Sequence, residues 1–86
     1  MTKWTVVWEE SAEGKLANIW FGAGQSLHVT ESSYQIDKAL KEDPRRHGKL
    51  LVEGLWVIER PPLRAVFTVS DDDRLVRVLS LSIVLF

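Results

Sequence analysis

Hydrophobic and polar side chains alternate over residues 4–9, at the start of the chain. One face of a strand here would carry Trp4, Val6 and Trp8, and the other would carry Thr5, Val7 and Glu9. An alternation with a period of two is typical of a strand that buries one face. The pattern therefore predicts that the chain begins with a strand.

The next segment changes to the spacing of a helix. Its apolar stripe comprises Ala12, Leu16, Ile19, Trp20 and Ala23. Ser11 precedes the stripe as a candidate N-cap, because a serine hydroxyl can accept a hydrogen bond from the first free backbone N–H groups of a helix. Gly22 and Gly24 predict where this helix ends.

A second helix is predicted to begin at Ser26, another candidate N-cap, and to run to Glu42. The residues that share its apolar face are Val29, Ser33, Ile36 and Leu40. Pro44 ends this helix, because proline disfavours helical geometry in the residue before it. Two consecutive helices with a short connection predict a helical hairpin.

The remaining pattern predicts three strands, at residues 55–60, 63–69 and 75–81. A loop at residues 45–53 around Gly48 precedes them, Pro61 and Pro62 separate the first two, and residues 70–73 form a turn. The order of elements is β-α-α-β-β-β. Short connections favour antiparallel pairing, so we expect an α+β fold with a mainly antiparallel sheet and the helical hairpin packed on one face.

Length and composition point to one domain. The chain has 86 residues, of which 45% are hydrophobic, and a chain of this size buries about 60 to 65% of its unfolded surface. We therefore expect a single domain over residues 1–86. The longest apolar stretch, residues 79–86, is interrupted by two serines and too short to span a membrane, and the start of the chain does not resemble a secretion signal. The sequence predicts a soluble, cytoplasmic protein with no membrane partner.

The charge of the chain is nearly balanced, but its distribution is uneven. The net charge is −1, from 11 basic and 12 acidic residues, which argues against binding nucleic acid through the overall field. Residues 38–64 carry seven basic and four acidic groups, a local excess of three. This segment is either a weakly anion-binding face or an ordinary solvated helix end and loop.

Standard catalytic and cofactor motifs are absent from the sequence. There is no cysteine, and the two histidines, His28 and His47, lack the spacing of metal ligands. Gly22 and Gly24 follow a predicted helix rather than a strand, so they do not form a phosphate-binding loop. We expect no metal and no cofactor, and the residues by themselves indicate only a small α+β domain.

The four tryptophans allow two interpretations, core packing or stacking on nucleic-acid bases. Trp4, Trp8 and Trp20 lie on the apolar faces of predicted elements, which favours core packing for these three. Trp56 shares a strand face with Ile58 and Arg60, and the pattern is compatible with either side of the sheet for this residue.

Five short motifs occur in order along the chain. They are the helix end Asp43-Pro44, Gly48, the strand motif Pro62-Leu63-Arg64, the acidic turn at residues 71–73 and the apolar strand at residues 75–81. In this order they resemble the RelE/ParE toxin superfamily, the plasmid-stabilisation toxins of type II toxin–antitoxin pairs. The resemblance covers nearly the whole chain. It implies the fold expected above and a toxin-like role, neutralised by a cognate antitoxin protein, in a bacterial cell.

The resemblance leaves the mode of action open. ParE-type members act by protein contact and are associated with blocking DNA gyrase. RelE-type members cleave messenger RNA on the ribosome, and a nuclease of that type would use Arg64 of the Pro-x-Arg strand, helped by Arg60 or Lys49, with His47 or Glu53 as a base. A third alternative is a family member that only binds a partner and is not toxic. The alternative interpretation of Arg64 is a surface residue paired with Glu59 or with an aspartate of the turn.

The end of the chain departs from the nuclease pattern. Nuclease members usually place a His, Tyr, Lys or Arg just beyond the last strand, whereas this chain has Ser82 followed by Ile83, Val84, Leu85 and Phe86. None of these side chains transfers a proton usefully near neutral pH. The difference favours protein contact as the expected mode of action. The apolar tail at residues 83–86 is then a candidate partner-binding segment, unless the last strand continues through it inside the sheet.

Overall fold

The computed structural model of the chain describes residues 3–22 and 26–84. In chain order, its elements are β1 (Thr5–Trp8), α1 (Glu10–Gly22), α2 (Ser26–Glu42), α3 (Pro44–His47), β2 (Lys49–Val52), β3 (Leu55–Arg60), β4 (Leu63–Ser70) and β5 (Leu75–Ile83). Among these described residues, no helix combines the length and the apolar character needed to cross a membrane.

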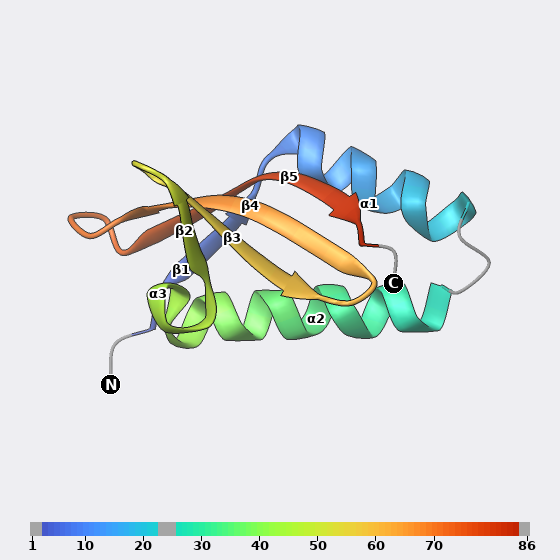
Figure 1. Cartoon of the computed structure of the whole chain (residues 1–86), viewed down its shortest axis with the longest axis horizontal. Helices are drawn as coiled ribbons and strands as arrows, with labels where there is room; N and C mark the ends of the chain where they lie inside the picture. Colours follow the sequence, from blue (N-terminus) through green and yellow to red (C-terminus); the bar gives the residue numbers. More distant parts are fainter. Residues whose placement is uncertain (1–2, 23–25, 85–86) are drawn as a thin grey trace.

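The strands form one sheet in the order β1-β5-β4-β3-β2. The neighbours among β2, β3, β4 and β5 pair antiparallel, and β1 pairs parallel to β5. Figure 1 shows α2 running along the sheet below β3 and β4, with α1 on the side of β5, and the two helices also contact each other. The predicted α+β fold, with a mainly antiparallel sheet and a helical hairpin against it, is confirmed.

The core lies between the helices and one face of the sheet. Its largest fully buried side chains are Phe67, Ile36, Leu40, Ile58, Leu63, Val29, Val76 and Val78. On β4 the buried positions are Leu63, Ala65 and Phe67, which alternate with the half-buried Arg64 and Val66. This period of two means that Arg64 and its cross-strand neighbours lie on the opposite face of the sheet, which we call the open face.

The prediction of a loop at residues 45–53 was wrong, because this segment contains most of α3 and all of β2. Pro44 both follows α2 and starts α3, since the Asp43 carboxylate accepts a hydrogen bond from the backbone N–H of Arg46 (3.3 Å) and proline suits the first turn of a helix. Gly48 then caps α3. Beyond it, β2 pairs with β3, so the sheet has one strand more than the sequence pattern predicted.

Some details of the first helix also differ from the prediction. Ser11 is not the N-cap, because α1 already begins at Glu10 and the Ser11 hydroxyl donates to the carbonyl oxygen of Leu79 (3.0 Å). Trp20 is not a core residue, because 43% of it is exposed. Its place is at the edge of the apolar stripe, one position beyond the buried Ile19. Ala23 and Gly24 lie outside the described residues.

Candidate functional site

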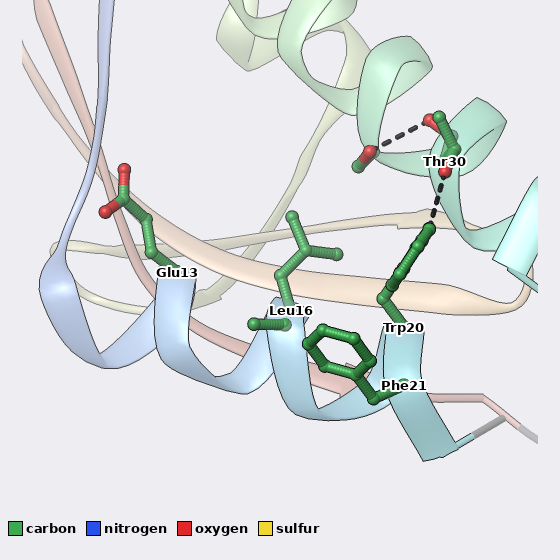
Figure 2. A pocket seen from close by; sticks show the side chains of 7 residues that line it. Glu13, Leu16, Trp20, Phe21 and Thr30 are labelled. Atoms are coloured by element: carbon green, nitrogen blue, oxygen red, sulfur yellow. Dashed lines mark hydrogen bonds between the residues drawn. The ribbon is translucent and has the colours of Figure 1, made fainter.

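A groove between α1 and α2 is lined mainly by apolar side chains. Figure 2 shows Leu16 and Trp20 pointing from α1 toward α2, with the Phe21 ring beside Leu16. The groove has a volume of about 320 Å³, and its lining residues are Glu13, Leu16, Ala17, Trp20, Phe21, Thr30 and Ser33. We call it the hairpin groove.

The aromatic end of the hairpin groove is held in place but stays accessible. The Trp20 indole N–H donates to the hydroxyl of Thr30 (3.0 Å), and the Trp20 and Phe21 rings meet edge to face with their centroids 5.2 Å apart. Phe21 is 80% exposed. An exposed phenylalanine beside a half-exposed tryptophan is unusual on a surface that binds nothing, because both side chains gain free energy when a partner removes them from water.

The hairpin groove continues into a second hollow of about 380 Å³ that shares four of its lining residues and extends to Trp8, Tyr34 and Asp37. The Asp37 carboxylate accepts a hydrogen bond from the indole N–H of Trp8 (3.2 Å) and pairs with Lys41 (2.8 Å). Tyr34 is 68% exposed. The two hollows together present a long apolar surface with carboxylates, including that of Glu13, along its rim.

Arg64 lies in a row of side chains across the open face. The strand register places it opposite Glu59 of β3 on one side and opposite Ser82 of β5 on the other. Its Nε atom is buried and has no hydrogen-bond partner among the described residues. Within the same residues, none of the ion pairs involves Arg64, so the expected alternative of a pair with Glu59 or a turn aspartate is not formed.

A small polar pocket lies beside this row, at the point where β2 begins. It has a volume of about 210 Å³ and is lined by His47, Lys49, Val57, Glu59 and Arg60. The Arg60 guanidinium donates to the Glu59 carbonyl oxygen (2.8 Å) and lies 3.5 Å from Nδ1 of His47. The structure therefore brings together three of the residues named from the sequence, and we call this site the His47 pocket.

Three cations outside the His47 pocket are paired with carboxylates. Arg77 of β5 lies 3.0 Å from Glu9, Lys41 pairs with Asp37, and Arg45 pairs with Asp71. The hydrogen bonds from Arg45 hold the pKa of the Asp71 carboxyl below its ordinary value. In the described parts of the chain, no three His, Asp or Glu side chains cluster as metal ligands would.

Solved structures of other proteins, and not family models, show what the fold of this chain resembles. No family model matches the chain, and no curated protein matches it. Solved structures do match: the RelBE2 toxin–antitoxin complex from Mycobacterium tuberculosis has a TM-score of 0.79 and 21% identity, over 96% of this chain and 93% of that one. The chain has the RelE/ParE fold.

Two further structures support this assignment of the fold. The chromosomal ParDE toxin–antitoxin system from P. aeruginosa has a TM-score of 0.73 and 19% identity, over 99% of this chain and 100% of that one. The isolated E. coli RelE toxin has a TM-score of 0.67 and 20% identity, over 96% and 86%. RelE-type and ParE-type structures both match, so the RelE/ParE fold alone does not distinguish the two modes of action.

In this RelE/ParE fold, the last strand ends beside the turn between β3 and β4. Ile83 still belongs to β5, pairs with Leu63 and is 44% exposed. The backbone N–H of Val84 donates to the carbonyl oxygen of Pro62 (2.8 Å). The strand therefore runs two residues past the predicted end at Leu81. Leu85 and Phe86, the other two residues of the proposed partner-binding tail, lie outside the described residues.

Sequence reasoning named Arg64 as a site residue but placed Glu59 beside it only as a possible ion-pair partner. A signal was present, because a turn at Pro61 and Pro62 pairs Arg60 with Leu63 and therefore Glu59 with Arg64. The sequence also named Glu53 as a possible base, but Glu53 lies between β2 and β3 and does not line the His47 pocket.

Proposed function

We propose that this chain is the toxin component of a type II toxin–antitoxin pair, acting by protein contact and neutralised by a cognate antitoxin. The fold it shares with RelBE2 and ParDE toxin–antitoxin structures supports this role. A cytoplasmic location in a bacterium belongs to the same proposal, because DNA gyrase, the candidate target, acts there.

The observation that carries the proposal is the hairpin groove. It exposes Trp20 and Phe21, and the hollow that continues it exposes Tyr34. Aromatic side chains of this kind dominate the energetics of protein interfaces. An antitoxin segment with apolar side chains would remove them from water. The exposed Ile83 at the end of β5 is a second place where such a segment would find apolar contact.

Protein contact is favoured over chemistry by the residues beside Arg64 on β5. Ser80 and Ser82 occupy the open face there, and Ile83 and Val84 follow them. A serine hydroxyl is too weak an acid to protonate a leaving group near neutral pH, and the two aliphatic side chains carry no proton to give.

The test is induction of the chain in a bacterial host, with and without the small reading frame beside its gene. We expect viable counts to fall on induction, a DNA-damage reporter to respond, and the neighbouring protein to restore growth.

Phe21→Ser should reduce this rescue, because it removes an exposed ring from the groove. Lys15→Ala is the matched control, since Lys15 is also exposed on α1 but does not line the groove. Equal rescue of both variants would exclude the groove as the antitoxin contact.

A ribosome-dependent messenger RNA endonuclease is the second candidate function, and one observation at Arg64 itself supports it. Among the described residues the Arg64 guanidinium forms no ion pair, so its terminal N–H groups can donate to a phosphate oxygen, while the facing Glu59 carboxylate could accept a proton from a ribose hydroxyl. Lys49, Arg60 and His47 lie beside Glu59. Primer-extension mapping of cellular messenger RNA after induction tests this candidate, because cuts inside translated codons would identify the nuclease.

A non-toxic binding protein is the remaining possibility. Normal growth, intact RNA and no DNA damage on induction, together with stable binding to the neighbouring protein, would identify it.

A further inference from the structure

The free edge of the sheet is unusually apolar. β2 is the last strand in the order, so one side of its backbone has no strand beside it among the described residues. Leu50, Leu51 and Val52 are 60%, 46% and 56% exposed. Proteins usually protect an edge strand with charged side chains or proline, because an exposed apolar edge pairs with other chains. Three adjacent exposed aliphatic residues are the opposite of that protection.

The His47 pocket lies at the beginning of this edge. The β2–β3 ladder starts with Lys49 opposite Val57, so Glu59 and Arg60 extend beyond it and have no β2 residue beside them. The space left there is the His47 pocket. A strand added along the free edge of β2 would pass the opening of the His47 pocket.

The charge in the His47 pocket suits one carboxylate. Lys49 and Arg60 are cationic, Glu59 is the one acidic residue of the lining, and His47 presents Nδ1 to Arg60. Among the described residues, neither cation is in an ion pair. The Arg60 guanidinium is already positioned by the Glu59 carbonyl oxygen, so less conformational entropy is lost when it binds an anion.

We propose that the β2 edge and the His47 pocket form one docking surface for an extended segment of a partner protein. The segment adds to β2 as an antiparallel strand and places apolar side chains over Leu50–Val52. An acidic residue that follows these apolar residues places its carboxylate between Lys49 and Arg60. Recognition by strand addition draws affinity from backbone hydrogen bonds and specificity from side-chain pockets.

The carboxylate is needed because β2 is short. An edge of four residues offers few backbone hydrogen bonds, and each contributes little net free energy because it replaces hydrogen bonds to water. Four residues also fix the register poorly, and a slip by one residue would move every side chain to the other face. A charge-assisted contact at one end of the strand selects a single register.

The same features disfavour a nucleic acid at this surface. RNA would bring a phosphate at every nucleotide, and its binding depends on many cations along a path. Here the cations are confined to one end of β2, the rest of the edge is aliphatic, and the chain has a net charge of −1. A single carboxylate next to apolar side chains matches this distribution better.

The experiment is an NMR titration of the isotopically labelled chain with a capped peptide of alternating threonine and valine that carries one glutamate near its C-terminal end. The control peptide has glutamine in place of that glutamate. We expect amide shifts at residues 47–52 and 59–60, and about fivefold tighter binding of the glutamate peptide. Arg60→Gln and Lys49→Gln should each reduce this preference. Arg74→Gln, an exposed cation in the β4–β5 turn, should leave it unchanged.

Several results would overturn the proposal. Equal affinity for the two peptides would remove the carboxylate from it, and shifts confined to the hairpin groove would remove the β2 edge. If a short single-stranded RNA shifted the His47 pocket and the glutamate peptide did not, the ligand would be a phosphate and not a carboxylate. The titration contains no cell and no antitoxin, so its outcome is independent of whether the chain is toxic.

Discussion

Arg45 of α3 donates two parallel hydrogen bonds to the Asp71 carboxylate in the turn between β4 and β5, at 2.8 and 2.7 Å. Its guanidinium carbon also lies 5.9 Å from the centre of the Trp4 ring and 6.0 Å from that of Trp56. One side chain thus contacts β3, the turn after β4 and the start of the chain. The short helix α3, and with it the beginning of β2, is fixed to the sheet through this contact.

The Arg45–Asp71 pair predicts a pH-dependent contribution to stability. The hydrogen bonds from Arg45 lower the pKa of Asp71 below its ordinary value of 3.8. A carboxyl group whose pKa is lower in the folded chain stabilises the fold above its unfolded pKa, and this contribution is lost as the pH falls through the folded pKa. Asp71→Asn should therefore lower the melting temperature at neutral pH, and the difference from wild type should close in acid.

Thermal melts of both proteins from about pH 7 to about pH 2 would check this, with Asp72→Asn as the control. Asp72 lies in the same exposed turn, and the ion pairs between described residues do not include it. A difference between wild type and Asp71→Asn that stayed constant down to the lowest pH would show that the ion pair does not carry the effect.

Much of the fold could be predicted because its long elements repeat their patterns many times. α2 has the predicted bounds, and β3, β4 and β5 are each present within two residues of the prediction. α3 and β2 have four residues each, too few to establish a period. All four residues of β2 are exposed, so it has no buried face to produce an alternation. Its pairing with β3 decides its structure, and that is a tertiary contact.

Gly48 lies between α3 and β2. The close packing around it predicts that one added methyl group lowers the stability of the fold. A Cβ at Gly48 would lie 2.6 Å from a ring carbon of Phe67 and 2.9 Å from the carbonyl oxygen of Pro44. Phe67 is fully buried and the carbonyl belongs to the backbone, so neither moves freely. We expect Gly48→Ala to lower the free energy of unfolding by about 1 to 3 kcal/mol.

Gly14→Ala is the matched control for this substitution. Gly14 is an exposed position inside α1 with open space around it, and alanine there should raise the free energy of unfolding by about 0.5 to 1 kcal/mol. Urea denaturation of both variants measures the two values. If Gly48→Ala were as stable as wild type, the close packing of Phe67 against α3 would be incorrect.

Ser32 is the one buried polar side chain among the described core positions, and it connects α2 with the turn between β3 and β4. Its hydroxyl donates to the carbonyl oxygen of Pro61 at 2.6 Å, and the residue is 3% exposed. We expect Ser32→Ala to cost about 1 kcal/mol in the free energy of unfolding. Ser33→Ala should change it by less than about 0.5 kcal/mol, because the Ser33 hydroxyl only donates to Thr30 within the same helix. Equal values for the two variants in urea denaturation would contradict a bridging role for Ser32.

The candidate sites were less predictable than the fold, and for a physical reason. The proximity of His47 to Arg60 depends on where α3 ends and β2 begins, which the sequence pattern did not contain. The exposure of Trp20 depends on how α1 is rotated about its own axis, because Trp20 directly follows the buried Ile19. By contrast, the position of Arg64 opposite Glu59 follows from a turn only two residues long.

Arg64 provides the prediction that bears most directly on function. Its buried Nε has no hydrogen-bond partner among the described residues, and an unsatisfied buried donor costs about 1 to 3 kcal/mol. Arg64→Ala removes this cost together with the packing of the aliphatic stem, so the free energy of unfolding should change by less than about 1 kcal/mol. We expect the folded variant to lose any toxicity, because a guanidinium kept without a partner on the open face is poised for an external ligand.

Arg77→Ala separates this role from a general loss of positive charge. Arg77 lies on the same face of the sheet but is paired with Glu9, and the loss of such an exposed pair should cost less than about 1 kcal/mol. Toxicity should therefore persist in Arg77→Ala and disappear in Arg64→Ala, measured as viable counts after induction. Undiminished toxicity in a folded Arg64→Ala variant would remove Arg64 from the functional site. Codon-internal messenger RNA cuts present in wild type and absent only in Arg64→Ala would instead assign the open face to RNA cleavage, because Arg77→Ala controls for the loss of positive charge on the same face.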